Sequence, residues 1–379
     1  MLYLVISGPE AAGRAMQEFQ IRKDGFVQKR VVEVEPAGQG PTIGDGEILL
    51  KIDRFAVTAN NITYAVAGDR LGYWQFFPPT GSATDGWGMM PVWGFAEVVE
   101  SNVDGVPVGD RLFGYFPPAT HLKMSPVKVT AVRLIDGAEH RSALPAPYNS
   151  YSRVNAEPGY NSDMDNERML LWPLFITSFC LWDALQDNNW YGAEQVVIVS
   201  ASSKTSIGLA YALAADATSP KAIAITSSRN LGLVNSLDLY QPSVIYESLT
   251  DIDAGTPTVI VDMSGNGKVL GRLHTHLGDN MTHCINVGLT HWDETHKSEG
   301  IISERSEFFF APSHIQKRAK DWGPEGFAQK TSAFMQETTL KSRDWLKLTR
   351  LDGLQGLADV YEQICGGRIA ADQGLIVEL

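Results

Sequence analysis

One short segment of the chain carries side chains that could bind an anion. From Val196 the sequence reads VVIVSASSKTSIGLA, in which Lys204 lies among small hydroxylic residues. An apolar run, a loop of small residues and the start of a helix, in this order, are typical of phosphate-binding loops. The reason is that backbone N–H groups at a helix N-terminus attract negative charge.

Two kinds of phosphate loop are compatible with this order. A triphosphate loop needs G-x-x-x-x-G-K-[ST]; Lys204 and Thr205 match its end, but both glycines are absent, so wrapping backbone amides around a triphosphate would be sterically costly. A dinucleotide loop normally carries G-x-G-x-x-G, of which only Gly208 is present, and hydroxylic Ser203 and Ser206 flank the lysine and threonine in the turn. Hydroxyls can cap the helix and bind phosphate. A capped helix start with a solvated lysine is the simpler alternative.

A second signal lies at the end of the next apolar run, AIAITSSRN. Arg229 follows Ser227 and Ser228 about twenty residues after the loop, where an NAD site usually has an acid for the ribose 2′-hydroxyl. An arginine with two serines and no acid suits a 2′-phosphate instead. The alternative is a surface arginine at the start of the next helix. Taken together, the two patterns predict a nucleotide site with NADP(H) as the cofactor.

The elements that position these residues follow from the rhythm of the chain. Helical or loop segments separate six short apolar runs, near positions 196, 222, 244, 259, 284 and 308. This alternation predicts βαβ units and a doubly wound parallel sheet. Before it, RMLLWPLFITSFCLWDAL predicts a buried helix, and GKVLGRLHTHLGD places Val269 or Leu270, Leu273 and Leu277 on one helix face.

The first part of the chain, to about Val129, predicts a different architecture. Segments such as GEILLKIDRFAV and VPVGDRLFGYF alternate apolar and polar residues between turns, which favours antiparallel strands in a small β-barrel or sandwich. The polar stretch from Ala131 to Glu167 predicts an ordered functional loop or a boundary. The tail from about Pro312 predicts helix, then a closing strand in GGRIAADQGLIVEL that returns to the first domain.

Composition limits the function classes. The 379 residues are long for one domain, and the formal net charge of -13 disfavours nucleic acid or an anionic membrane as a partner. The three cysteines lie far apart, which argues against a disulfide framework or a structural zinc knot. We find no stretch of membrane-span length. These features predict a soluble cytoplasmic protein.

The order of the parts resembles the medium-chain dehydrogenase/reductase superfamily, in its zinc-free, quinone-oxidoreductase-like branch. GEILLKIDRFAVTANNITYAVAGD resembles its opening strand pair, WGFAEVVESNVDGVPVGDRLFG its glycine-rich turn and next strand, and VVIVSASSKTSIGLA its A-x-G-G-V-G loop. SASSKTS with FFFAPSHIQKR resembles an uncharacterised bacterial branch. The resemblance implies an α/β protein with a GroES-like substrate domain over 1–165, a Rossmann NADP-binding domain over 166–312 and a return to the substrate domain over 313–379.

The sequence departs from the zinc enzymes of that superfamily. Their G-H-E turn reads WGFAE here, with Phe95 in place of the histidine, and both the early cysteine and the cysteine quartet are absent. We therefore expect no catalytic zinc. His274 and His276 lie two apart on a predicted helix and cannot share a face, so we expect no metal there either.

The resemblance also implies which residues act. Tyr64 lies in the loop where related enoyl reductases have a tyrosine, and Asn60 or Asn61 could bind a carbonyl or the nicotinamide ribose; packing at the rim is the alternative role for the tyrosine. His291 is a candidate acid, or else a solvated loop histidine. The cofactor is further expected to contact three small or apolar residues that follow the fourth and fifth strands, namely Ser264, Val287 and Gly288.

Two aromatic loops, Leu71–Pro79 and Pro147–Arg153, predict either a cover over an apolar or aromatic substrate or simple packing. SEFFFAP predicts an edge strand that a partner buries in a homodimer.

Three functions are compatible with these patterns. The leading hypothesis is an NADP(H)-dependent, zinc-free oxidoreductase that reduces a small carbonyl, enone or quinone. A non-redox lyase or hydrolase on the same fold and an NADPH-sensing binding protein are the alternatives.

Overall fold

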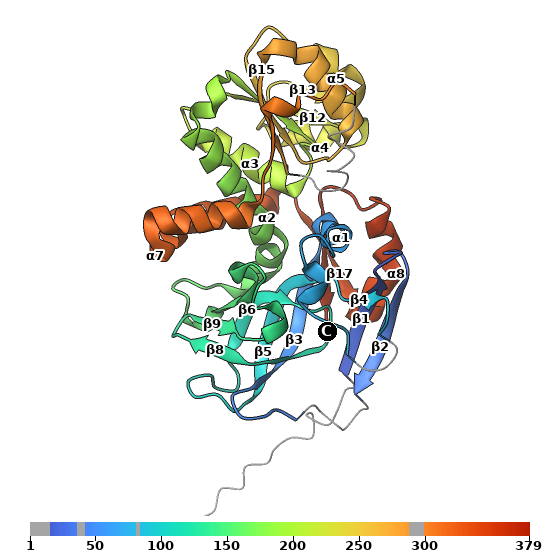
Figure 1. The fold of residues 1–379 in the computed structure, drawn as a ribbon, viewed down its shortest axis with the longest axis vertical. Coiled ribbons are helices and arrows are strands. Elements are labelled where there is room, and N and C mark those ends of the chain that lie inside the picture. The colour runs from blue at the N-terminus through green and yellow to red at the C-terminus, as the bar shows by residue number, and fades with distance from the viewer. Residues whose placement is uncertain (1–15, 36–41, 81–83, 288–298) are drawn as a thin grey trace, which may run out of the picture. The chain divides into compact units, whose positions relative to one another are not determined.

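The chain forms two compact units, shown in Figure 1. The computed structural model describes residues 16–35, 42–80, 84–287 and 299–379. The first unit comprises 1–162, 349–368 and 375–379, and the second comprises 163–348 and 369–374. The boundary at 162/163 falls inside the polar stretch for which the sequence predicted a functional loop or a boundary.

The first unit is rich in antiparallel strands, as predicted. One sheet has the order β2-β1-β4, and a larger one has the order β17-β18-β3-β5-β6-β10-β9-β8, with β7 paired to β3. Its strands are β1 (Met16–Arg22), β2 (Lys29–Glu35), β3 (Ile48–Val57), β4 (Trp87–Gly88), β5 (Val92–Ser101), β6 (Arg111–Phe116), β7 (His121–Met124), β8 (Pro126–Val129), β9 (Arg133–Asp136), β10 (Ser150–Arg153), β17 (Lys347–Asp352) and β18 (Gln373–Glu378).

Short helices cover these sheets. They are α1 (Ala59–Val66), α8 (Gly353–Cys365) and the 3₁₀ helices η1 (Tyr73–Gln75) and η3 (Ala146–Asn149). Thr58 begins α1 with a capping box: its hydroxyl accepts from the N–H of Asn60, and the Asn61 side chain accepts from the N–H of Thr58. This cap fixes the segment in which Tyr64 lies.

The second unit contains a six-stranded parallel sheet in the order β13-β12-β11-β14-β15-β16. In chain order this is 3-2-1-4-5-6, so the prediction of a doubly wound sheet is confirmed. Every residue of β11 and β14 is buried, as expected for central strands covered on both faces. The strands are β11 (Gln195–Val199), β12 (Lys221–Thr226), β13 (Ser243–Ile245), β14 (Thr258–Asp262), β15 (Met281–Asn286) and β16 (Ser306–Phe308).

Helices flank this sheet: α2 (Asp165–Asp187), α3 (Lys204–Ala215), α4 (Leu231–Ser236) and α5 (Gly267–Leu277). A further helix, α7 (Ala311–Lys341), packs on α2. The predicted face of α5 is confirmed, because Val269, Leu270, Leu273 and Leu277 are all buried against the sheet core. By length and composition the segment Ser162–Asp187 could cross a membrane, which corrects the sequence-based statement that no stretch is long enough. However, 67% of its apolar window is buried inside the protein, as in a core helix.

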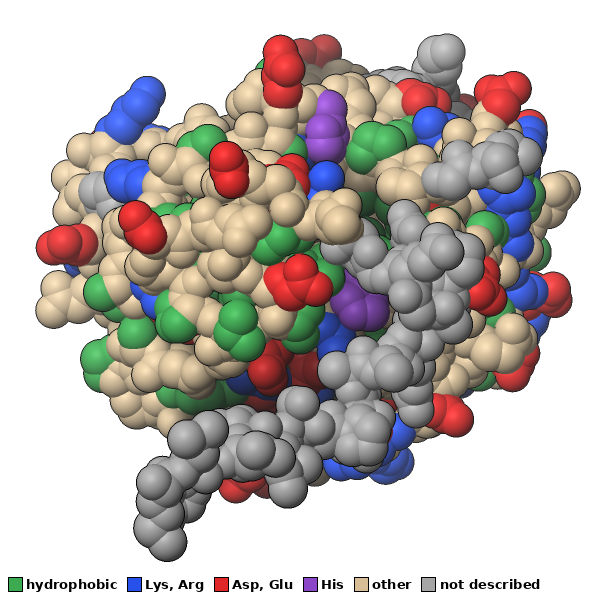
Figure 2. All heavy atoms as spheres, turned by 90° about the horizontal axis from the view of Figure 1, so that it is seen from below, with side chains coloured by type: hydrophobic (Ala, Val, Ile, Leu, Met, Phe, Trp, Pro, Cys, Tyr) green, Lys and Arg blue, Asp and Glu red, His purple; other side chains and the backbone are tan. Residues whose placement is uncertain are grey.

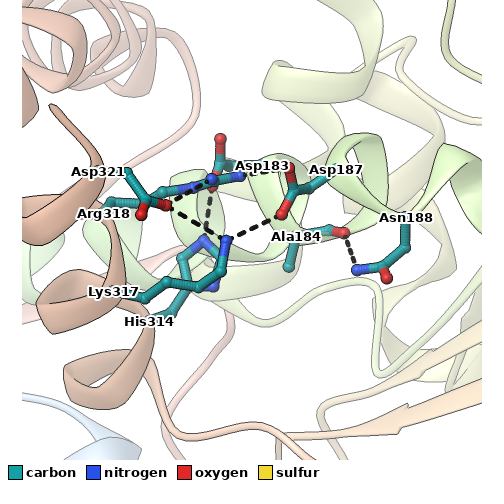
Figure 3. Close-up of polar contacts among 8 residues, drawn as sticks. All are labelled: Asp183, Ala184, Asp187, Asn188, His314, Lys317, Arg318 and Asp321. Carbon is teal, nitrogen blue, oxygen red and sulfur yellow. Dashed lines mark hydrogen bonds and ion pairs between the residues drawn. The ribbon is translucent and has the colours of Figure 1, made fainter.

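The return to the first unit begins later than predicted. The sequence placed 313–379 with the first domain, whereas contacts assign α7 and the chain up to Leu348 to the second unit. The physical reason is an ion-pair cluster between α2 and α7, drawn in Figure 3, whose centre is buried and whose outer members are exposed. Its centre is Asp183, whose Oδ2 accepts from Nε2 of His314 at 2.6 Å and from Nε of Arg318 at 2.5 Å. The cluster also includes Asp187, Lys317 and Asp321.

The excess of negative charge is not gathered on the face drawn in Figure 2. Acidic side chains are interspersed there with basic and apolar ones.

Gly208 in α3 should be required for the packing of α3 on α2. A Cβ there would lie 2.5 Å from Oγ of Ser178 and 2.6 Å from Cδ1 of Phe175. We expect Gly208→Ala to lower the free energy of unfolding by about 1–3 kcal/mol in urea titrations, although alanine favours helix.

The matched control is Gly232→Ala in α4, where a Cβ would meet nothing within 4 Å. It should be neutral or stabilising by up to about 1 kcal/mol. Equal effects of the two substitutions would contradict the close approach of α3 and α2.

Candidate active site

The loop after β11 is held by hydrogen bonds among its serines. Ser200 adopts a positive φ of 65°, and its carbonyl accepts from the N–H of Ser203 and from Oγ of Ser206, each at 2.9 Å. Oγ of Ser203 in turn caps α3 by accepting from the N–H of Ser206 at 3.1 Å. Ser203 and Thr205 are half-buried, whereas Ser206 is fully buried. Ser206 therefore shapes the turn from inside, and Ser203 and Thr205 are the hydroxyls near its surface.

Lys204 is not the solvated lysine considered in the sequence analysis. Its Nζ donates to the carbonyl oxygens of Ala371 and Gln373, at 3.0 and 2.8 Å. Burial lowers the pKa of Lys204 to about 8, against a smaller opposing effect of Asp372. The ammonium group thus connects the start of α3 to the segment 369–374. The prediction that Lys204 binds a cofactor phosphate stays untested, but its described hydrogen bonds are to this segment.

Gly208 lies where α3 contacts α2, as described above. Its lack of a side chain leaves room for Ser178, whose hydroxyl donates to the carbonyl of Thr205 at 2.7 Å. The structure thus gives this glycine a helix-packing role that the motif comparison did not predict.

The loops after β11 and β12 lie next to each other, since the two strands pair in parallel. Nδ2 of Asn230 donates to Oγ of Ser202 at 2.9 Å and links the two loops directly. Ser227 precedes a short 3₁₀ turn and is half-buried, while Ser228 and Arg229 are exposed. The predicted 2′-phosphate residues are therefore accessible at the carboxyl end of β12.

A buried carboxylate that the sequence analysis missed organises the end of β14. Asp262 accepts from the N–H and the hydroxyl of Ser264, at 2.8 and 2.6 Å, and from the N–H of Gly265 at 3.0 Å. Burial raises the pKa of Asp262, and these hydrogen bonds lower it again in part. Its carbonyl accepts from the N–H of Val287 at 2.8 Å. Ser264 and Val287 are therefore both held by Asp262. In the sequence, an acidic residue at the end of a strand with Ser264 and Gly265 shortly after it was the pattern that could have revealed this role.

Gly288 and His291 lie outside the described residues, so their predicted roles stay predictions.

In the first unit, Asn61 has a structural role that was not predicted. Its Oδ1 accepts from the N–H of Thr58 at 2.8 Å, and its Nδ2 donates to the carbonyl of Pro91 at 2.9 Å. The side chain is 4% exposed. The hydrogen bonds of the Asn61 side chain therefore hold α1 in place and leave little capacity to bind a substrate.

Tyr64 belongs to a cluster of aromatic side chains. Its ring centroid lies 4.6 Å from that of Tyr73 and 5.7 Å from that of Tyr115, and the Tyr115 and Tyr148 centroids are 4.6 Å apart. Trp93 packs on Tyr115 at 5.1 Å. The two predicted aromatic loops thus do come together, through Tyr73 and Tyr148, whose hydroxyls are 3.3 Å apart.

Burial raises the pKa of Tyr64 far above its ordinary value, and Tyr148 raises it further. The side chains of Trp93, Asn60 and Tyr115 lower it, because they lie close enough to stabilise the phenolate. Tyr64 is therefore a neutral phenol at physiological pH, a state in which it can donate a proton. The sequence analysis did not single out Trp93 on β5 or Tyr115 on β6. The alternation of residues along these strands was the pattern that could have placed their side chains on the inner face.

The second unit offers a donor set that fits a nicotinamide dinucleotide phosphate. The first turn of α3 leaves backbone N–H groups without intrahelical partners, and Ser203 caps the N–H of Ser206. The exposed Arg229 at the neighbouring strand end suits a phosphate monoester. Among the described residues, no group of three or more His, Cys, Asp or Glu side chains could hold a metal ion.

Comparison with known proteins places the chain in a family. The family described as "Protein of unknown function (DUF2855)" matches residues 55–370. The chain belongs to this family. No curated protein matches it.

Solved structures are similar over nearly the whole chain. CurA from Vibrio vulnificus has a TM-score of 0.60 and 12% identity, covering 96% of this chain and 98% of that one. CurA in complex with NADPH has a TM-score of 0.58 and 13% identity, with 92% and 94% covered. An Etr1p complex with NADP and crotonyl-CoA has a TM-score of 0.57 and 14% identity, with 97% and 100% covered.

These similarities confirm the fold prediction. The DUF2855 chain has the fold of the medium-chain dehydrogenase/reductase enzymes, a GroES-like part combined with a Rossmann part. At such low identity the likeness shows the fold and leaves the chemistry to the residues themselves.

The half-buried Lys204 of this DUF2855 protein should make its stability rise in mildly alkaline solution. The unfolded lysine keeps its proton to about pH 10, whereas the folded one loses it near pH 8, so between these values the unfolded state binds more protons. Stability must then increase with pH across this window. We expect the free energy of unfolding of the wild type, relative to Lys204→Met, to rise by up to about 3 kcal/mol.

Urea titrations at a series of pH values would measure this difference. Lys221→Met removes an exposed lysine at the start of β12 and should show no such trend. A flat difference between wild type and Lys204→Met would mean that Lys204 keeps an ordinary pKa.

Proposed function

We propose that this protein is an NADP(H)-dependent, zinc-free oxidoreductase that reduces a small carbonyl, enone or quinone. One observation carries the proposal: Ser203 at the start of α3 and Arg229 after β12 lie at the neighbouring carboxyl ends of β11 and β12. In a doubly wound sheet this is the edge at which a dinucleotide binds. Complexes of the similarly folded CurA with NADPH and of Etr1p with NADP support the same cofactor.

The roles of the residues follow from their chemistry. The first turn of α3, with Ser203 and Thr205, would hold the pyrophosphate, and Arg229 with Ser227 and Ser228 would hold the 2′-phosphate. Ser264, Val287, Gly288 and His291 remain candidates near the nicotinamide. The cofactor supplies a hydride when bound.

On the substrate side, Tyr64 is the proposed proton donor. Its hydroxyl is kept protonated by burial, and the donors beside it stabilise the phenolate that remains after the proton has left. Asn61 then acts by holding α1, and therefore Tyr64, in place.

The proposal also includes an oligomeric state and a cellular compartment. β16 ends the strand order of the parallel sheet and is followed by half-buried Phe309 and Phe310, so we propose a homodimer formed through this edge. The cysteines are free thiols, two of them buried, which suits a reducing cytoplasm.

A non-redox lyase or hydrolase is the second candidate. It is favoured by Lys204 and Gly208, because the loop uses both for internal contacts rather than leaving them open to a pyrophosphate. Oxidation of NADPH in step with loss of an acceptor distinguishes the two, since only the reductase consumes the nucleotide. Binding of NADPH with no turnover of any acceptor would instead indicate a sensing protein.

Arg229→Ala should weaken NADPH selectively. A charge-assisted phosphate contact contributes about 1.5–3 kcal/mol, so we expect the dissociation constant of NADPH to rise about tenfold or more while that of NADH is nearly unchanged. Titration followed by nicotinamide fluorescence measures both constants.

Lys221→Ala is the matched control, because Lys221 is an exposed cation at the opposite end of the same strand, β12. It should leave both nucleotides unaffected. Equal weakening of NADPH and NADH by Arg229→Ala would exclude 2′-phosphate recognition, and failure of the wild type to bind either nucleotide would overturn the proposed cofactor site.

A further inference from the structure

The turn that joins α2 to β11 has a backbone conformation that residues with side chains rarely adopt. In this turn, η6 (Asn189–Gly192), the φ angles of Asn189, Trp190 and Tyr191 are 50°, 55° and 54°, and that of Gly192 is 71°. Three successive left-handed residues with side chains cost free energy, which contacts of the turn must offset. Trp190 supplies some of them, because it is buried in the core of the second unit.

The side chain of Tyr191 contacts two residues from the last strands of the parallel sheet. Its ring lies flat on the imidazole of His283 in β15, with the ring centroids 4.0 Å apart and the planes 7° from parallel. Its hydroxyl donates to Oε1 of Glu307 in β16 at 2.9 Å, and Nε2 of His283 lies 3.1 Å from that same oxygen. Three elements therefore meet at one carboxylate oxygen. We call Tyr191, His283 and Glu307 the edge cluster.

The edge cluster lies at the end of the strand order of this sheet. Glu307 is the middle residue of the three-residue strand β16, which follows β15 as the last strand. It pairs with Ile285, which is buried in the same core as Trp190, so the Glu307 side chain lies on that face of the sheet. The Glu307 side chain is 49% exposed, against 18% for His283. The carboxylate is therefore the part of the cluster that a partner can reach most easily.

We propose that the edge cluster is the centre of an interface with a second copy of this chain, and that the charge on His283 controls how tightly the two copies associate. The proposal rests on the homodimer through β16 proposed above. It adds the central contact of that homodimer and a dependence of its stability on pH.

Two-fold symmetry would bring the two copies of Glu307 together. When a strand pairs antiparallel with its own copy about a two-fold axis through its centre, the middle residue lies opposite itself. Residues opposite each other in such a pair have Cα atoms about 4.5–5.5 Å apart and side chains on the same face of the sheet. Two carboxylates in these positions repel each other and weaken the association.

The imidazole beside each carboxylate offsets this repulsion. A protonated His283 gives each copy one cation next to its anion, so the interface then holds two charges of each sign. An edge with both charges is complementary to itself, as an interface between identical copies has to be. The Tyr191 hydroxyl holds the carboxylate next to His283. A neutral His283 leaves the two carboxylates without this compensation.

Histidine is the member of the edge cluster that changes charge near neutral pH. The hydrogen bond from His283 holds the pKa of Glu307 below its usual range, so Glu307 stays a carboxylate. Burial raises the pKa of Tyr191, which therefore stays a neutral phenol. Because the protonated form of His283 favours association, the dimer should weaken as the pH rises through the range in which histidine loses its proton.

The other charged groups on the elements that pack against β15 have partners or lie away from His283. On β14, the residue that pairs with His283 is the apolar Val259, and Asp262 is bound to its own loop. On η10 (Ser303–Arg305), Glu304 is exposed and Arg305 donates to the carbonyls of Asp279 and Met281.

Sedimentation equilibrium of the full chain, at constant ionic strength from about pH 6 to about pH 8.5, tests the proposal. We expect the dissociation constant of the wild-type dimer to rise about threefold to tenfold across this range. His283→Gln keeps a hydrogen-bond donor without the charge, so its dimer should stay near the weak alkaline value throughout. Glu307→Gln removes the repulsion, so at the alkaline end it should associate more tightly than the wild type.

Two further variants separate this role from a structural one. Tyr191→Phe keeps the stacked ring but loses the hydrogen bond to Glu307, so it should reduce the change with pH and still form the dimer. His121→Gln is the matched control, because His121 lies on β7 in the first unit, and it should keep the wild-type pH dependence. Thermal unfolding at each pH checks that every variant is folded.

A dimer whose dissociation constant does not change with pH, or changes equally in the wild type and His283→Gln, overturns the role of the edge cluster and leaves the homodimer intact. A monomer at every pH and concentration overturns the homodimer and this inference together. Nucleotide binding is measured separately from association, so a failure of the proposed cofactor site is distinguishable from both results.

Discussion

The turn between β11 and α3 is the constraint on which the second unit depends. Ser200 adopts a left-handed conformation that side chains normally avoid, at a cost of about 1–2 kcal/mol. Two hydrogen bonds to its carbonyl, from Ser203 and Ser206, offset this cost. Where related loops use glycine to make the turn, this chain uses side-chain hydroxyls. The result is a loop that is already ordered by its own contacts and that leaves fewer groups for a ligand.

Residues of α3 also make contacts within the protein that leave them less available to a ligand. Lys204 at its start holds the segment 369–374, and Gly208 one turn later lets Ser178 and Phe175 of α2 approach. A residue of a ligand loop can therefore have a packing role without a change of fold. This is the physical reason why the motif was weak in the sequence. Most of the glycines that normally mark a pyrophosphate loop are replaced here by residues whose side chains bind other parts of the protein.

The sequence was sufficient for the architecture and insufficient for the site. The six apolar runs and the alternating first part are periodic signals, so the doubly wound sheet and the antiparallel sheets could be predicted. The boundary at 312 was wrong because the polar face of α7 gave no indication that Arg318 and His314 are buried against Asp183. Trp93 and Tyr115 were missed for the same reason: their importance arises from partners that are distant in sequence. Asp262 was missed although its side-chain partners, Ser264 and Gly265, lie only two and three residues away.

The aromatic cluster shows what the fold alone cannot decide. Many chemistries share this architecture, and an identity of 12–14% to the compared enzymes carries none of them across. Buried polar groups without a partner do not by themselves mark a substrate site. The hydroxyl of Tyr361, inside α8, is also buried without a partner among the described residues. The side chains of Trp93 and Tyr115 stabilise the phenolate form of Tyr64. The case for Tyr64 as a proton donor therefore rests on these surroundings, and measured turnover must decide it.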